Sequence, residues 1–193
     1  MRVALVNNGA SEPKKILELL KTDSVKVFDF SNADSINTKD FDFLVLSGSS
    51  QFPVAFYRDK LKAEIELITR SSILTLGICY GCELIAAAFG GELTDKGEQN
   101  KEKNILEIEV IEDDPIFKGL KSFAAYDAHR WIIKTVPPQF KVLAKSKHGP
   151  EIIKHKELPM YGFQFHPEKM TDQTYGDELF QILKASPLGF PVQ

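Results

Sequence analysis

The chain has 193 residues, of which 43% are apolar, and a formal net charge of −3 at pH 7. This length and composition predict one globular domain with a sizeable hydrophobic core. The near-neutral charge gives no general attraction to nucleic acid or to anionic membranes. No apolar run approaches the roughly 18 residues of a membrane span, and the N-terminus lacks a signal-peptide pattern. We therefore expect a cytoplasmic protein without a nucleic-acid or membrane partner.

The first half of the chain alternates predicted strands and helices. Apolar strands are expected at residues 2–6, 25–30, 41–46 and 73–78, and helices at residues 13–20, 54–69 and 83–89. Nearly continuous apolar strands between helices indicate a parallel sheet that is covered on both faces. The predicted fold class is therefore α/β, with an open, mostly parallel sheet of the flavodoxin-like type.

The second half is expected to extend this sheet with antiparallel strands. Short strands are predicted at residues 104–111, 140–144, 151–154 and 160–165, separated by proline- and glycine-containing turns. A last helix should begin near Thr174 and Asp177, which have the spacing of a capping pair. Residues 1–185 are thus predicted to form a single domain and residues 186–193 a frayed tail. His148 and His155 lie among lysines near turns and are expected to be exposed.

Residues 71–91 contain the main candidate for chemistry, Cys79, between an apolar strand and a helical stretch. Gly77 and Gly81 lie two residues to either side of it, the spacing of a nucleophile on a tight strand-to-helix turn, where larger side chains would collide. The turn places the sulfur near a helix N-terminus, which favours the thiolate. It also makes the backbone N–H of Tyr80 available to bind an oxyanion. A buried structural cysteine is the alternative interpretation.

A second candidate motif lies at the end of a predicted strand, where His166 and Glu168 are separated by Pro167. Residues two apart in extended backbone point to the same side. A histidine beside a carboxylate is the base and its orienting group in a cysteine triad. Alone, such a histidine is more often structural, but together with Cys79 it indicates catalysis.

Cys79 and Cys82 also form a C-x-x-C pair, which is compatible with a dithiol redox site. Gly77 argues against this alternative, because the nucleophile turn uses it and a redox motif does not explain it. A zinc site would need further cysteine or histidine ligands, and the chain has no second cysteine pair. We therefore expect neither a metal nor a cofactor, and we expect Cys82 to pack as a small apolar group.

The two motifs together resemble those of the class I, or triad, glutamine amidotransferases. The stretch 77–81 (GICYG) and the stretch 165–168 (FHPE) occur in the order and at the separation of that family, and the chain length also fits. The stretch 155–166 and the segment 175–179 look most like the free-standing glutaminase subunit of archaeal-type GMP synthetase. This resemblance implies that Cys79, His166 and Glu168 form the catalytic triad.

The resemblance also implies roles for two loops. The loop after the third strand would supply a second oxyanion donor from Gly48 or Ser49, in addition to Tyr80. The segment 126–131 would approach glutamine and a synthetase partner, which makes His129, Arg130 and Trp131 candidate substrate-binding residues. From the residues alone, His129 is as readily a surface loop histidine, and the loop at residues 47–50 is as readily a plain turn.

The chain departs from the family pattern at three positions. The family commonly has glutamine four residues after the nucleophile, where this chain has Glu83, and histidine or methionine just before it, where this chain has Cys82. The family also has a second glycine where this chain has Ser49. Glu83 could accept hydrogen bonds from a substrate amide or ammonium group, but its charge would raise the pKa of the Cys79 thiol. These departures bear on substrate binding and basal rate more than on reaction class.

The expected function is therefore hydrolysis of glutamine to glutamate and ammonia. By resemblance, ammonia would pass to a separate ATP-dependent synthetase subunit of the GMP synthetase type. Two alternatives remain at this point: a stand-alone hydrolase of γ-glutamyl compounds, and a non-catalytic binding module with a degenerate site.

Overall fold

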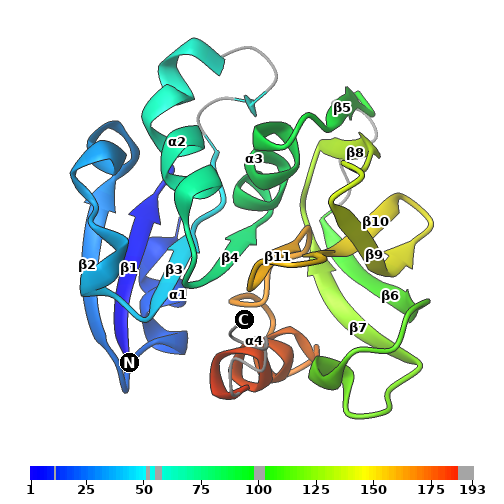
Figure 1. Ribbon diagram of the computed structural model, residues 1–193. Coiled ribbons are helices and arrows are strands. Elements are labelled where there is room, and N and C mark those ends of the chain that lie inside the picture. The colour runs from blue at the N-terminus through cyan, green and yellow to red at the C-terminus, as the bar shows by residue number, and fades with distance from the viewer. Residues whose placement is uncertain (11, 51–52, 55–57, 98–102, 187–193) are drawn as a thin grey trace.

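Within the residues that the structure describes, a nine-stranded sheet runs through the protein and four α-helices pack against it (Figure 1). The computed structural model describes residues 1–10, 12–50, 53–54, 58–97 and 103–186. The predicted tail lies outside these residues, except for Ser186. The helices are α1 (Pro13–Leu19), α2 (Lys62–Arg70), α3 (Tyr80–Ala88) and α4 (Gly176–Ala185). No helix within the described ranges is long and apolar enough to cross a membrane.

The strands follow the predicted order, with three additional ones in the second half. They are β1 (Arg2–Asn7), β2 (Ser24–Asp29), β3 (Phe43–Leu46), β4 (Leu74–Ile78), β5 (Glu92–Asp95), β6 (Asn104–Val110), β7 (Ser122–Asp127), β8 (Trp131–Thr135), β9 (Phe140–Ser146), β10 (Gly149–His155) and β11 (Met160–Phe163). Strands β5, β7 and β8 are not predicted from the sequence. Strands β7 and β8 include the two ends of the segment 126–131, which is expected to be a loop.

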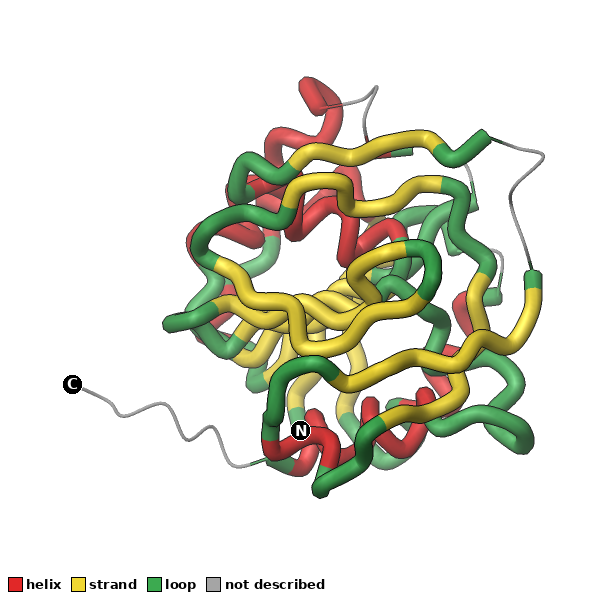
Figure 2. The backbone as a smooth tube through the Cα atoms, turned by 90° about the vertical axis from the view of Figure 1, so that its right-hand side faces the viewer, coloured by secondary structure: helices red, strands yellow, loops and turns green. Residues whose placement is uncertain are grey.

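The sheet order is β2-β1-β3-β4-β11-β10-β9-β6-β7. The first five strands are parallel, and β10, β9, β6 and β7 continue the sheet with antiparallel pairing. Figure 2 shows this antiparallel half from the side, with β5 and β8 forming a separate two-stranded sheet. The predicted fold class, a mostly parallel α/β sheet with an antiparallel extension, is confirmed.

Two hydrophobic clusters fill the two faces of the sheet. Side chains of α1 and α4 lie in one cluster, and side chains of α2 and α3 lie in the other. In Figure 1, α3 lies in the upper part of the view and α4 at the bottom, with β4 and β11 between them. The strands between them are buried on both sides, as in β3, where all four residues are buried. This is the burial pattern that the apolar strands predicted.

Three glycines let α3 lie directly against the sheet. A methyl group at Gly77 would lie 2.3 Å from the carbonyl oxygen of Gly81, and one at Gly81 would lie 2.4 Å from that of Leu46. On the neighbouring strand β11, a methyl group at Gly162 would lie 2.6 Å from Sγ of Cys82. Real side chains do not approach so closely, so any larger residue at these positions would push α3 away from β3, β4 and β11.

Several local predictions differ from the structure. Strand β11 ends at Phe163, two residues earlier than predicted, because the backbone of His166 pairs with Tyr126 of β7 instead of continuing beside β4. Helix α4 has no side-chain cap, since the hydroxyl of Thr174 donates to the carbonyl of Lys169. Of the predicted helix at 54–69, the part described is a 3₁₀ turn from Arg58 to Leu61 followed by α2.

The prediction that His155 is exposed is wrong. The residue is 5% exposed, and its ring packs edge-on against Phe140 and at a tilt against Phe89. Its Nδ1 accepts hydrogen bonds from the backbone N–H groups of Glu157 and Leu158, at 3.0 and 2.9 Å. The histidine therefore closes the turn after β10. His148 is half-buried, also in contrast to the prediction.

Candidate active site

Cys79 lies at the junction of β4 and α3, in a backbone conformation that residues other than glycine rarely adopt. Its φ is 50° and its ψ is −106°, which is a strained, positive-φ conformation for a residue other than glycine. The backbone N–H of Cys79 donates to the carbonyl of Phe163 over 2.7 Å, and its carbonyl accepts from Glu83 over 3.0 Å. The turn therefore has the strand–nucleophile–helix geometry that the glycine spacing predicted.

His166 and Glu168 form the predicted pair. Nδ1 of His166 lies 2.7 Å from Oε1 of Glu168, and both side chains are largely buried. The backbone of His166 is fixed separately, since its N–H donates to the carbonyl of Tyr126 over 2.9 Å. With Nδ1 facing the carboxylate, Nε2 is the nitrogen left to face a reacting group.

The cysteine and the histidine meet at Gly48, in the loop after β3. A methyl group built on Gly48 would lie 3.2 Å from Cε1 of His166 and 3.7 Å from Cβ of Cys79. The two side chains thus flank the same buried glycine, although they are remote in sequence. A side chain at position 48 would occupy the space between them.

One backbone N–H group faces the sulfur, and the loop of Gly48 and Ser49 lies nearby. The N–H of Tyr80, the first residue of α3, faces the thiol of Cys79 and acts to lower its pKa. Such N–H groups in the first turn of a helix have no partner within the helix. Gly48 is buried beside Cys79 and Ser49 is half-buried. Ser49 does not have a positive φ, so the replacement of the family's glycine requires no left-handed backbone at this position.

The electrostatic surroundings of Cys79 favour the neutral thiol. Burial raises its pKa well above the ordinary value, and the carboxylates of Glu83 and Glu168 raise it further, against the opposing effect of the Tyr80 N–H. The sequence-based expectation that the helix N-terminus favours the thiolate is therefore not met in this structure. The main reason is burial of the thiol, and Glu83, which lies one turn further along α3, adds to this effect.

Glu168 is ionised in this site although it is buried. Burial acts to raise its pKa, but the electrostatic interaction and the hydrogen bond with His166 outweigh burial and hold the pKa of Glu168 below its usual value. A carboxylate that stays ionised stabilises an imidazolium ring and fixes its orientation. The pair is therefore suited to accept a proton from a neighbouring thiol.

Glu83 points into the interior beneath the nucleophile. It is 4% exposed, and Oε1 accepts a hydrogen bond of 3.1 Å from the side-chain amide of Gln164. Burial raises its pKa to about 7, against the lowering effects of Gln164 and of the charge on His129. Glu83 thus changes its charge near neutral pH. Gln164 lies in the same stretch as His166, but sequence reasoning did not single it out.

His129 is a buried cation and not a surface residue. It is 2% exposed, its Nε2 lies 3.0 Å from Oδ1 of Asp127, and its Nδ1 lies 2.8 Å from the carbonyl of Trp131. Burial lowers its pKa, but the carboxylates of Asp127 and Glu151 raise it to about 9. The charge of His129 lowers the pKa of Glu83, which links this histidine to the residues around the nucleophile.

The other two predicted binding residues lie nearer the surface. The guanidinium of Arg130 forms an ion pair with Asp95 at the end of β5, with Nη2 2.5 Å from Oδ2. Trp131 begins β8 and is half-buried. The structure therefore places Cys79, His166, Glu168, Tyr80, Gly48, Ser49 and Glu83 around one site. It leaves His129 and Arg130 in the turn between β7 and β8, and Trp131 at the start of β8.

Comparison with known proteins identifies the family. The sequence model of the family described as glutamine amidotransferase class-I matches residues 4–185. The chain belongs to the class I glutamine amidotransferases.

Named relatives of this amidotransferase are glutamine-hydrolyzing subunits of GMP synthase. The one from Pyrococcus abyssi is 45% identical over 108 residues, which is 55% of this chain and 56% of that protein, so this match spans about half of each. The one from Methanococcus maripaludis (strain S2) is 33% identical over 195 residues, covering 97% of this chain and 98% of that protein. A crystal structure of a candidate GMP synthase subunit from Thermoplasma acidophilum superposes with a TM-score of 0.82 and 26% identity, covering 95% of this chain and 92% of that one.

The second cysteine of this amidotransferase, Cys82, is not part of a metal-binding cluster among the described residues. Cys82 is buried on α3 against Gly162, and both cysteines are free thiols. Within the described ranges, no three histidine, cysteine or acidic side chains are arranged to hold a metal ion. Burial is the largest cause that raises the pKa of Cys82. This environment fits the packing role predicted for Cys82.

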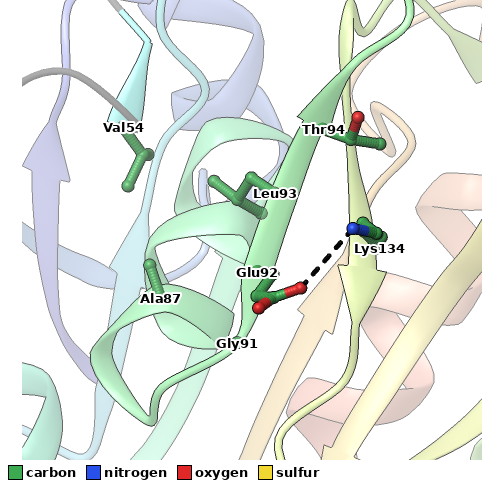
Figure 3. A pocket seen from close by; sticks show the side chains of 7 residues that line it. All are labelled: Val54, Ala87, Gly91, Glu92, Leu93, Thr94 and Lys134. Carbon is green, nitrogen blue, oxygen red and sulfur yellow. Dashed lines mark ion pairs between the residues drawn. The ribbon is translucent and has the colours of Figure 1, made fainter.

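A separate pocket opens beside the far end of α3 (Figure 3). It is lined by Val54, Ala87, Gly91, Glu92, Leu93, Thr94 and Lys134. Glu92 and Lys134 form an ion pair across it at 3.8 Å. None of its lining residues belongs to the candidate active site.

The charge on His129 gives a first testable prediction. Because its pKa of about 9 lies above the ordinary 6.5, we expect His129 to be an imidazolium at pH 7.5, while His155, whose pKa burial lowers, is neutral. The two rings can be distinguished by ¹⁵N NMR of labelled protein. By linkage, His129 contributes about 3 kcal/mol of stability, complete below pH 6.5 and lost as the pH rises through about 9. A neutral ring at position 129 at pH 7.5 would contradict the prediction.

Proposed function

We propose that this amidotransferase hydrolyses glutamine to glutamate and ammonia with Cys79, His166 and Glu168. The observation that carries the proposal is the meeting of Cys79, on a strained turn, with the His166–Glu168 pair at Gly48. A thiol, a base and a carboxylate that orients the base are the groups that acyl transfer by a cysteine nucleophile requires. The single domain proposed for residues 1–185 contains all of them.

The first half of the reaction forms a thioester. His166 takes the proton of the Cys79 thiol as the sulfur attacks the γ-carbonyl carbon of glutamine. The N–H of Tyr80 and an N–H of the Gly48–Ser49 loop bind the resulting oxyanion. His166 then gives its proton to the departing nitrogen, and ammonia leaves.

The second half regenerates the enzyme. His166 removes a proton from water, which attacks the thioester carbon. The tetrahedral intermediate collapses, glutamate leaves, and the sulfur takes back a proton. Glu168 remains ionised throughout and holds Nδ1 of His166, so that Nε2 faces the reacting atoms in both halves.

The buried thiol fits this sequence of proton transfers. Since the pKa of Cys79 is raised by burial, Glu83 and Glu168, the resting nucleophile is neutral and needs His166 as a base. A carboxylate beside the sulfur would also lower the rate of glutamine hydrolysis when no partner is bound, because it disfavours the thiolate. We propose that Glu83 and Gln164 form the floor of the glutamine site, where Glu83 accepts hydrogen bonds from a substrate amide or ammonium group.

We further propose that the ammonia is used by a separate, ATP-dependent synthetase subunit in the cytoplasm. The relatives named as glutamine-hydrolyzing GMP synthase subunits support this assignment, with conversion of XMP to GMP as the proposed use. The ion-paired Arg130 and the half-buried Trp131 lie at the turn between β7 and β8, where a partner could contact them. His129 lies in the same turn, and its charge lowers the pKa of Glu83, which in turn affects the pKa of Cys79.

The triad assignment predicts the effect of single substitutions on glutamine hydrolysis. Cys79→Ala and His166→Ala should each lower kcat by about 10³-fold or more, because they remove the nucleophile or its base. Cys82→Ala is the matched control, since it removes a thiol one turn away, and it should keep most of the activity. Glutamate release would be measured with and without a synthetase subunit.

Two results would count against the proposed function. If Cys79→Ala or His166→Ala turned over glutamine at a rate close to that of the unmodified chain, the triad assignment would be wrong. Activity on γ-glutamyl peptides that does not change when a synthetase partner is added would instead favour the stand-alone hydrolase.

Glu83 gives a separate prediction for the reactivity of the nucleophile. Glu83→Gln should shift the pH midpoint of Cys79 alkylation by iodoacetamide downward by about one pH unit, because it removes a carboxylate beside the thiol. The midpoint would be measured by mass spectrometry of the Cys79 peptide. Glu92→Gln, on the exposed strand β5, is the charge-matched control and should leave the midpoint unchanged. An unshifted midpoint in Glu83→Gln would show that Glu83 does not control the thiol.

A further inference from the structure

The loop after β3 is bonded to the turn after β1, on the side away from the nucleophile. Strands β1, β3 and β4 are successive neighbours in the sheet, and they are parallel. Asn8 directly follows β1 and Cys79 directly follows β4, so they lie on opposite sides of the loop that begins at Ser47. The contacts of this loop with the turn after β1 are therefore outside the proposed triad.

Ser47 is 1% exposed, and each of its polar groups has a partner. Its backbone N–H donates to the carbonyl of Val6 over 3.0 Å, and its carbonyl accepts from Nδ2 of Asn8 over 3.2 Å. Its Oγ lies 2.9 Å from the backbone nitrogen of Asn8 and 2.9 Å from the carbonyl oxygen of Gly48. Such a side chain is fixed in position, because any rotation would break buried hydrogen bonds.

Hydrogen-bonding capacity fixes the direction of each of these bonds. The backbone N–H of Asn8 only donates, so Oγ of Ser47 accepts from it and gives its single proton to the carbonyl of Gly48. The carbonyl of Ser47 only accepts, so the side chain of Asn8 presents its NH₂ group. This orientation agrees with its effect on Glu64 of α2. Burial raises the pKa of Glu64 to about 8, and Asn8 acts to lower it, as a donor does.

The hydroxyl of Ser47 also determines where the next peptide N–H points. The carbonyl of Gly48 and the N–H of Ser49 belong to one peptide group, and no peptide bond in the described part of the chain is cis. In a trans peptide the C=O and the N–H point in opposite directions. Since the carbonyl of Gly48 is held on the side of β1, the N–H of Ser49 is directed toward the side of β4, where Cys79 follows.

The far end of the loop is bonded to the same turn. The backbone N–H and Oγ of Ser50 both donate to the carbonyl of Gly9, each over 3.1 Å. The peptide between Gly48 and Ser49 therefore lies between two fixed points, and Gly48 flanks the nucleophile. Donors that are fixed before charge develops are the ones that stabilise an oxyanion most.

We propose that Ser47 is a positioning residue, whose hydroxyl holds the carbonyl of Gly48 and thereby directs the N–H of Ser49 at the oxyanion that forms when Cys79 attacks. The proposal rests on the proposed glutaminase function for its kinetic consequence, but not for the hydrogen bond itself. It assigns the second oxyanion donor to Ser49. Without the hydroxyl, the peptide can rotate and the N–H can turn away, while the rest of the glutamine site is unchanged.

The first test measures kcat and KM for glutamine hydrolysis in Ser47→Ala. Complete loss of an oxyanion donor costs about 10²- to 10³-fold in kcat, so we expect a misdirected donor to lower kcat about tenfold or more. KM should change less than about twofold, because the hydroxyl does not contact glutamine.

Ser71→Ala is the matched control. Ser71 is 2% exposed, its Oγ lies 2.9 Å from Oγ1 of Thr75, and it precedes the end of β4 that is remote from Cys79. Both variants lose one buried, hydrogen-bonded hydroxyl, so urea unfolding should show similar small decreases in stability. Only Ser47→Ala should lose kcat. Unchanged kcat in Ser47→Ala, or an equal loss in Ser71→Ala, would overturn the proposal.

The second test does not depend on activity. In the unmodified chain, the hydroxyl proton of Ser47 should be protected from solvent and give an NMR signal with a nuclear Overhauser contact to the amide proton of Asn8. The carbonyl ¹³C resonance of Gly48 should move upfield in Ser47→Ala and stay in place in Ser71→Ala, because a carbonyl that loses a hydrogen bond is more shielded.

The two tests separate the two proposals. If the unmodified chain does not hydrolyse glutamine, the proposed function fails, and the spectra still decide whether the hydroxyl of Ser47 holds the peptide. If Ser47→Ala does not fold, the hydroxyl signal of the unmodified chain decides. An unprotected hydroxyl proton, or an unshifted Gly48 carbonyl in Ser47→Ala, would contradict the positioning role.

Discussion

The parallel pairing of β4 with β11 is the constraint on which the rest of the site depends. It sets Ile78 opposite Phe163, and the N–H of Cys79 then bonds the carbonyl of Phe163. The nucleophile and the strand that leads to His166 therefore leave the sheet side by side. Glycines at 77, 81 and 162 permit this arrangement, because they let α3 start directly above the two strands. Without this register, the thiol of Cys79 and the imidazole of His166, which are 87 positions apart in sequence, would not be brought to the same place.

The site buries two carboxyl groups beside the nucleophile. Glu83 and Glu168 both disfavour the Cys79 thiolate. The charge of the buried His129, in the turn between β7 and β8, lowers the pKa of Glu83 and so opposes the effect of burial on it. Such a site suits a nucleophile that is neutral at rest. A change at the surface turn that carries His129 would alter the balance at Glu83 and so reach the sulfur.

Sequence reasoning predicted the features that short-range patterns encode. The spacing of Gly77, Cys79 and Gly81 predicts the turn because the steric conflict is local, and the separation of His166 and Glu168 predicts their contact for the same reason. The burial of His129 could not be predicted, since Glu151 of β10 is remote in sequence and approaches the ring only in the folded protein, whereas Asp127 lies just two residues away. Glu64 of α2, which is 1% exposed, was missed because a single polar residue in an amphipathic helix is easily assigned to the exposed face. Its spacing of three residues from both Leu61 and Leu67 was the available signal.

The central claim is that the sulfur of Cys79 forms a covalent bond to the γ-carbon of glutamine while His166 moves the protons. The most direct measurement is mass spectrometry of the chain quenched with acid during turnover of isotopically labelled glutamine. The account predicts a labelled γ-glutamyl thioester on the peptide that contains Cys79 and Cys82, retained in Cys82→Ala and absent from Cys79→Ala. Label that survives in Cys79→Ala, or turnover of glutamine without any thioester under conditions that trap one in a known glutaminase, would contradict it.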